Sequence, residues 1–126
     1  MEFKDKQSIY LQIADYICER ILLGKWPSGE RIPSVRDLAA MLEVNPNTVM
    51  RTYDFLQNKE IIFNKRGIGY SADDNAANKI LRYRKERFLE TELPDVFRTL
   101  YLLNITMDEL NSRYTKFITD TFPVTT

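Results

Sequence analysis

Histidine is absent from this chain of 126 residues, and cysteine occurs once, at Cys18. Without histidine, the commonest general acid–base and metal-binding side chain is missing. A single cysteine excludes an intrachain disulfide and a cysteine-based zinc site. The sequence also has no nucleophile motif, phosphate-binding glycine loop or cluster of carboxylates with metal spacing, so we expect neither an enzyme nor a cofactor. We interpret Cys18 as a small buried hydrophobic residue; a reactive thiol is the alternative.

Long apolar runs are missing as well. No segment is long enough to span a bilayer, and the charged start at residues 1–6 lacks the apolar stretch of a signal peptide. We therefore expect a cytoplasmic protein with no membrane partner. The length suits one domain, or a small domain with an appended helical piece, of ordinary soluble composition.

The chain has no excess of positive charge, because 18 lysines and arginines balance 18 acidic residues. This balance argues against nucleic-acid binding, since DNA-binding domains are often basic. Residues 31–71, however, contain six lysines and arginines and four acidic residues, which is an excess of two positive charges. Lys65 and Arg66 have no acid beside them. A small excess predicts modest non-specific affinity and a shallow salt dependence for each subunit.

Three helices are expected in the first half of the chain. Apolar residues recur at helical spacing over residues 8–23. Ser34 is a suitable N-cap for a short helix over residues 35–42. Asn45 is a second strong N-cap, and Pro46 stands at the first position of the helix that follows, where its missing N–H costs nothing. A short helix, a tight turn and a second capped helix are typical of a helix-turn-helix.

A small β-hairpin follows these helices. Residues 61–63 form a short apolar strand, residues 70–72 can return beside it, and residues 64–69 make a basic tip with two glycines. The predicted fold is therefore mainly α with a small β-hairpin. It consists of an N-terminal winged helix-turn-helix at residues 1–73 and a short helical dimerisation domain at residues 74–126.

The second half predicts a homodimer. Its apolar residues mark three short amphipathic helices, interrupted near Leu93 and Pro94 and capped again by Thr106 with Glu109. Three such short helices cannot enclose a core with a large ligand cavity. We therefore expect the apolar faces of two copies to bury each other across a two-fold axis. Their aromatic residues are compatible with ordinary core packing or with a bound small-molecule effector of unknown identity.

Two stretches resemble the DNA-binding domain of the GntR family of bacterial transcription regulators. They are PSVRDLA at residues 33–39 and VNPNTVMRTY at residues 44–53, followed by GIGY at residues 67–70. The turn and the small C-terminal part resemble the YtrA subfamily. The resemblance implies a dimeric regulator, usually a repressor, that binds a palindromic operator. In such proteins the third helix enters the major groove of double-stranded DNA, and the wing reaches the minor groove.

Contacts to DNA are assigned to the polar, basic and glycine residues of these motifs: Ser34, Arg36, Asn45, Asn47, Thr48, Arg51, Lys65, Arg66 and Gly67. The resemblance implies that Arg36 contacts phosphate or guanine, and that Asn47 and Thr48 contact bases and phosphates. Arg66 and Gly67 would serve the wing. Pro46 stands where many members of the family have arginine, so a guanine contact is either lost or transferred to Asn47 or Arg51.

Other interpretations of the same residues stay open. Helix capping alone explains Ser34 and Asn45, and Arg36 could be merely solvated. Lys65 and Arg66 could protect the edge of the hairpin from aggregation. The whole fold could also be a winged-helix protein–protein interaction module without specific DNA binding. Polar residues on the exposed face of the third helix favour DNA, because a protein interface would favour aromatic anchors there.

Overall fold

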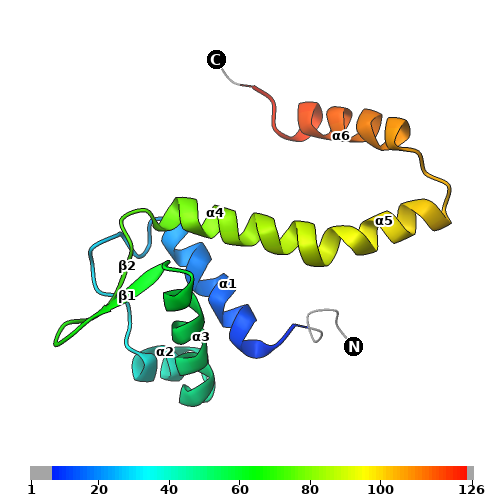
Figure 1. Cartoon of the computed structure of the whole chain (residues 1–126). Coiled ribbons are helices and arrows are strands. Elements are labelled where there is room, and N and C mark those ends of the chain that lie inside the picture. The colour runs from blue at the N-terminus through cyan, green and yellow to red at the C-terminus, as the bar shows by residue number, and fades with distance from the viewer. Residues whose placement is uncertain (1–6, 125–126) are drawn as a thin grey trace. The chain divides into compact units, whose positions relative to one another are not determined.

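The computed structural model describes residues 7–124, so the charged start at residues 1–6 lies outside the described part. The fold is mainly α with one antiparallel hairpin, as predicted (Figure 1). The elements, in chain order, are α1 (Ile9–Leu22), α2 (Val35–Leu42), α3 (Pro46–Asn58), β1 (Ile62–Lys65), β2 (Gly69–Ala72), α4 (Ala76–Arg87), α5 (Leu93–Leu102) and α6 (Met107–Thr121). Among residues 7–124, no helix is both long and apolar enough to cross a membrane.

The two predicted caps set the helix-turn-helix. Ser34 Oγ accepts a hydrogen bond from the Asp37 N–H at 3.1 Å, and Asn45 Oδ1 accepts one from the Asn47 N–H at 2.7 Å. These bonds satisfy backbone donors that a helix start leaves unpaired. The predicted bounds of α2 and the predicted start of α3 at Pro46 are confirmed. Glu43 makes the turn between them in the left-handed region, with φ of 55°.

The core lies between α1 and the helix-turn-helix. Thr52, which is buried on α3, donates its hydroxyl hydrogen bond to the backbone oxygen of Tyr10 on α1 at 2.8 Å. Cys18 is fully buried, which confirms its interpretation as a small hydrophobic residue. The largest side chains buried around these positions are Ile17, Ile32, Leu38, Tyr53, Leu56, Ile61, Ile62 and Ile80.

The strands of the hairpin reach further toward the tip than predicted, because β1 runs to Lys65 and β2 begins at Gly69. Lys65 pairs with Gly69, so both belong to strands and the turn shortens to residues 66–68. The prediction that Lys65 lies in the tip is therefore wrong. Gly69 has φ of 117°, a conformation that side chains rarely allow, and this lets pairing resume directly after the turn. The wing is thus a narrow hairpin that extends from the helices (Figure 1).

Contacts divide the chain into two compact units, one up to Arg84 and one from Lys85 onward. Ile80 and Tyr83 of α4 belong to the same buried cluster as the winged helix. The first unit therefore extends beyond residue 73, where the sequence pattern placed the boundary. The sequence pattern marks where the hairpin ends, but it does not show which face of α4 packs onto α3.

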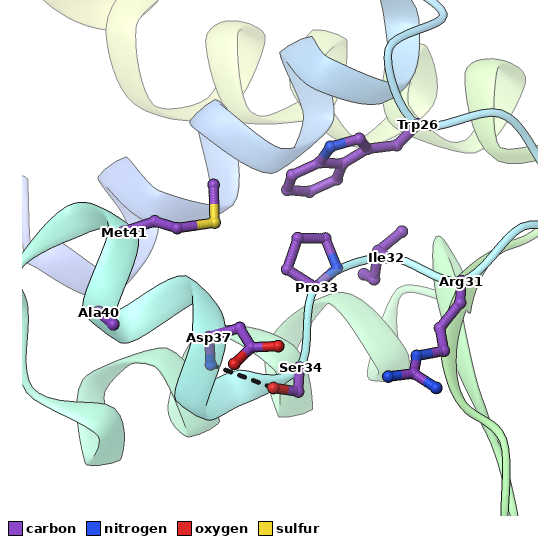
Figure 2. A pocket seen from close by; sticks show the side chains of 8 residues that line it. All are labelled: Trp26, Arg31, Ile32, Pro33, Ser34, Asp37, Ala40 and Met41. Atoms are coloured by element: carbon purple, nitrogen blue, oxygen red, sulfur yellow. Dashed lines mark hydrogen bonds between the residues drawn. The ribbon is translucent and has the colours of Figure 1, made fainter.

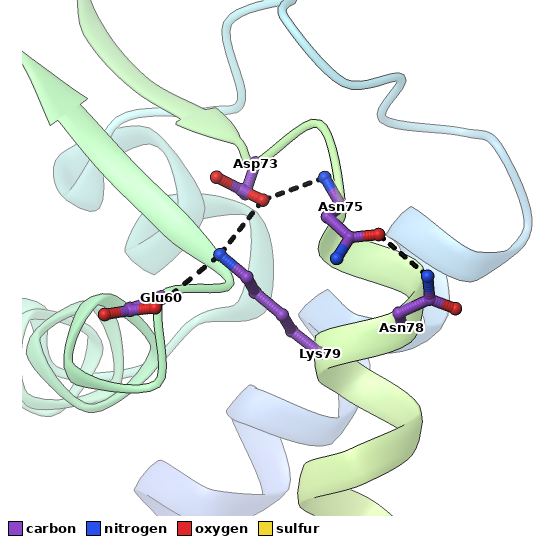
Figure 3. A network of polar contacts seen from close by, with 5 residues as sticks. All are labelled: Glu60, Asp73, Asn75, Asn78 and Lys79. Atoms are coloured by element: carbon purple, nitrogen blue, oxygen red, sulfur yellow. Dashed lines mark hydrogen bonds and ion pairs between the residues drawn. The ribbon is translucent and has the colours of Figure 1, made fainter.

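A polar network fixes the start of α4 (Figure 3). Lys79 Nζ lies 3.2 Å from Asp73 Oδ2 and 3.7 Å from Glu60 Oε1. The Asn75 N–H donates to Asp73 Oδ2 at 2.8 Å. This hydrogen bond, together with the Lys79 ammonium, holds the pKa of the Asp73 carboxyl below its ordinary value. The end of α3 and the first turns of α4 are joined by one lysine.

The second unit contains a π-helical segment, Phe88–Glu92, directly before Pro94. The Leu93 N–H bonds to the Phe88 oxygen, five residues earlier, and the backbone is helical from residue 76 to residue 102. The sequence predicts that the helix ends or kinks at this place. In the structure the helix continues through this place as a π-helical turn. The cap of α6 is confirmed, because Thr106 Oγ1 accepts from the Glu109 N–H at 3.1 Å.

Apolar side chains of the second unit are largely exposed. In its described part only Leu100 is buried, and α6 has no buried residue. The large exposed apolar residues on α5 and α6 or directly after them are Val96, Phe97, Tyr101, Leu102, Leu103, Met107, Tyr114, Phe117 and Phe122. This is far more exposed apolar surface than a short stretch of a monomeric protein usually carries.

Candidate DNA-binding surface

The first turns of α3 present three polar side chains on one face. Asn47 and Arg51 are exposed, and Thr48 is half-buried. Arg51 follows Asn47 by four residues and Thr48 by three, so it neighbours both on the helix surface. They line a hollow of about 290 Å³ with the start of α1, which adds Ser8, Ile9 and Tyr10. The sequence predicts contacts for the α3 residues but gives no sign that α1 borders them.

A second hollow, of about 650 Å³, lies beside the start of α2 (Figure 2). Its lining includes Ser34, Arg31, Trp26 and Asp37. Ser34 Oγ accepts the capping bond, and its O–H hydrogen remains able to donate to a second acceptor such as a phosphate oxygen. Trp26 packs edge-on against Tyr16 with ring centroids 6.2 Å apart, which supports an anchoring role in the loop.

A third hollow, of about 370 Å³, joins the start of α2 to the wing. Ser34 lines this hollow too, together with Gly67, Ile68 and Arg31. Gly67 has φ of 81°, and a Cβ there would meet nothing within 4 Å, so its backbone is open to close approach. Lys65 and Arg66 are exposed beside it, while Arg36 is exposed on α2. The predicted residues thus occupy α2, the start of α3 and the wing.

Arg31 is a cation of this surface that the motifs do not single out. It forms an isolated β-bridge with Ser71, and the adjacent Ile32 N–H donates to the Tyr70 oxygen at 2.8 Å. Its side chain crosses Gly69, where an added Cβ would lie 3.3 Å from Arg31 Cδ. The two residues are far apart in sequence, so only the fold reveals that a glycine makes room for the arginine.

The cations of this surface form no ion pairs in the described part of the chain. These cations are Arg31, Arg36, Arg51, Lys65 and Arg66. Glu60, which follows the C-terminal end of α3, does form an ion pair, with Lys79. A chain of zero net charge therefore still presents unpaired cations where a phosphate backbone could lie. In the same described range no group of three or more potential metal ligands occurs.

Comparison with known proteins decides the family. The family model for bacterial regulatory proteins of the gntR family matches residues 9–71, which include α1, the helix-turn-helix and the wing. The chain belongs to the GntR family. It is a GntR-family transcriptional regulator with a helix-turn-helix DNA-binding domain, and the resemblance found in the sequence is confirmed.

GntR relatives match nearly the whole chain. The uncharacterised HTH-type transcriptional regulator YhcF of Bacillus subtilis is 32% identical over 86% of this chain and 88% of its own length. The HTH-type transcriptional repressor YtrA of the same organism is 30% identical over 82% of this chain and 78% of its own. A crystal structure of a GntR-family protein from Bacteroides thetaiotaomicron is 49% identical, with a TM-score of 0.78, over 90% of this chain and 98% of that one.

Tyr53 holds the parts of the GntR domain together. Its hydroxyl donates to the Pro33 oxygen at 2.6 Å, just before α2, and its ring meets Tyr70 of the wing edge-on, with centroids 4.8 Å apart. Burial raises the pKa of the Tyr53 phenol well above its ordinary value, so it stays a neutral donor. The sequence predicts only that Tyr53 is buried, because a hydrogen bond across 20 residues leaves no local signal.

Replacing Tyr53 with phenylalanine should lower the free energy of unfolding by about 1 to 3 kcal/mol, because the Pro33 oxygen loses its donor while the ring stays packed. Urea unfolding followed by circular dichroism measures this change. Tyr70→Phe is the matched control, since the structure shows no hydrogen bond from the Tyr70 hydroxyl within residues 7–124. Equal effects of the two substitutions would contradict the role given to the Tyr53 bond.

Proposed function

We propose that this GntR-family regulator is a repressor that binds a palindromic operator as a homodimer. The third helix, α3, enters the major groove with Asn47, Thr48 and Arg51. The wing places Arg66 and Gly67 in the minor groove, with Lys65 beside them on the phosphate backbone. Ser34 and Arg36 of α2 and the cap residue Asn45 contact the backbone or the outer bases.

The observation that carries this proposal is the position of the unpaired cations around the polar start of α3. Arg36, Arg51 and Arg66 come from α2, α3 and the wing, and all three are exposed without an acidic partner within residues 7–124. Cations on neighbouring elements suit the two phosphate strands that border a groove, and amide and hydroxyl groups between them suit base edges. A protein interface would favour aromatic anchors on this face instead, and an enzyme would need acid–base or nucleophilic groups.

The apolar surface of the second unit supports the homodimer. With Leu100 the only buried residue among residues 85–124, the aromatic and aliphatic side chains of α5 and α6 need a partner, and a second copy of the same unit supplies matching apolar surface. A two-fold dimer presents two copies of α3, which accounts for a palindromic site. Repression is proposed from similarity to YtrA, which carries the name of a repressor.

Selection from random DNA duplexes tests the proposal. The protein is expected to enrich an inverted repeat whose half-site centres are about one helical turn apart. Light scattering should give the mass of a dimer, both free and on the operator. In transcription in vitro, added protein should reduce RNA from a promoter that overlaps the enriched sequence. Enrichment of a sequence without an inverted repeat would contradict the proposal. Enrichment of no sequence would contradict it too and would favour a protein-interaction module.

A further inference from the structure

The guanidinium of Arg51 lies over the ring of Tyr10. The distance from Arg51 Cζ to the ring centroid is 3.9 Å, well within the range of a cation–π contact. Arg51 is exposed on α3, whereas Tyr10 is half-buried on α1. Within residues 7–124, Arg51 has no acidic partner that would otherwise fix its position. The aromatic ring is therefore the main restraint on this cation.

Tyr10 is itself held firmly by α3. Its backbone oxygen accepts the hydroxyl hydrogen bond of Thr52 at 2.8 Å. Its ring meets Phe55 at 78°, with centroids 5.9 Å apart. Three residues of α3, at positions 51, 52 and 55, thus contact a single residue of α1. A ring held by its backbone and by a neighbouring aromatic ring is a rigid platform for the arginine.

We propose that Tyr10 is a positioning residue that orients Arg51 for a bidentate contact to a guanine in the major groove. This inference rests on the proposed function and deepens it. The hydrogen-bond donors of a guanidinium lie in its plane, and a Cζ that is 3.9 Å from the ring centroid is close enough for the guanidinium to stack on the ring with those donors free. A guanine offers O6 and N7 side by side, which a planar pair of donors matches.

The location of the pair supports this role. Arg51 lines the hollow of about 290 Å³ that Asn47 and Thr48 also line, so the oriented cation belongs to the predicted base-reading surface. Because the ring restricts Arg51 before DNA arrives, less side-chain entropy is lost on binding.

The competing explanation is that the pair only fastens α1 to α3. The two explanations differ in what a change at Tyr10 does to base preference. A fastening role lowers stability and weakens binding to all DNA sequences equally. A positioning role lowers the preference for one base pair, and this is the same base pair that depends on Arg51.

The test uses the full-length protein, the operator enriched by selection, and duplexes that carry each base-pair substitution singly. Arg51→Ala is expected to reduce discrimination at one G·C pair by about tenfold or more. Tyr10→Leu should reduce discrimination at that same pair by about fivefold. Tyr10→Phe, which keeps the ring face, should retain it. Adding Tyr10→Leu to Arg51→Ala should cause no further loss at this pair.

The unfolding midpoint of each variant is measured as well, so that a loss of stability is not mistaken for a loss of base preference. If Tyr10→Leu is unstable, Tyr10→Met replaces it, because methionine fills gaps without an aromatic face. An even loss of affinity across all duplexes, or a loss at a base pair that Arg51→Ala leaves unchanged, would overturn the inference while the proposed function stands. Enrichment of no sequence by the parent protein would overturn both.

Discussion

Replacing Arg36 with alanine is expected to abolish specific operator binding while the dimer stays intact. Arg36 is exposed on α2, two residues after the Ser34 cap, and within residues 7–124 it has no ion-pair partner that the substitution would disturb. A bidentate arginine contact to guanine contributes about 1 to 3 kcal/mol of discrimination. A dimer makes two such contacts, so the loss is roughly 2 to 6 kcal/mol. Fluorescence anisotropy with operator and scrambled duplexes measures it.

Arg82→Ala provides the matched control for this substitution. Arg82 is an exposed cation on α4 of the same unit, so its removal lowers the net charge by the same amount without touching α2, α3 or the wing. The control should retain the preference for operator over scrambled DNA. If Arg36→Ala binds the operator as tightly as the parent, the proposed contact is wrong. A loss that is equal on both duplexes would instead identify Arg36 as a phosphate contact.

Replacing Phe117 with aspartate is expected to convert the dimer to monomers. Phe117 is exposed on α6 and belongs to the apolar face that we propose is buried by a second copy. A charge placed in an apolar interface without a partner is costly. A monomer binds one half-site only, so operator affinity should fall by about a hundredfold or more. Light scattering reports the mass, and anisotropy reports the affinity.

Ser112→Asp is the control on the same helix. Ser112 is also exposed, but its position on the helical repeat is opposite to that of Phe117. The control adds the same charge and should remain dimeric with unchanged affinity. Dimers of Phe117→Asp with full operator affinity would place the interface elsewhere. Unfolding of both variants should be compared, because Phe117 also packs edge-on against Phe122 with centroids 6.2 Å apart.

Local signals predicted the helix-turn-helix well. The caps at Ser34, Asn45 and Thr106 act through hydrogen bonds within three residues, so the sequence alone defines where α2, α3 and α6 begin. Periodic apolar residues likewise predict which side of each helix is buried. The strand ends at the tip of the hairpin leave less local signal, because they depend on the φ of Gly69 and on pairing between the strands.

Long-range contacts account for what the sequence did not predict. Arg31 joins the wing through a bridge to Ser71, and Tyr53 donates to Pro33, without any local pattern that links the partners. The same holds for Tyr10, whose helical spacing predicts an apolar face rather than a platform for Arg51. These contacts arise from the packing of α1, α3 and β2, which periodicity does not encode.

We expect this GntR-family protein to recognise a particular DNA sequence as a dimer. The most direct measurement is the ratio of its affinities for the enriched operator and a scrambled duplex, titrated from low to physiological salt. We expect both affinities to fall with salt, because both involve phosphate contacts, while the operator stays preferred by about a thousandfold or more. Equal affinities for the two duplexes at every salt concentration, or no binding to either, would contradict the claim.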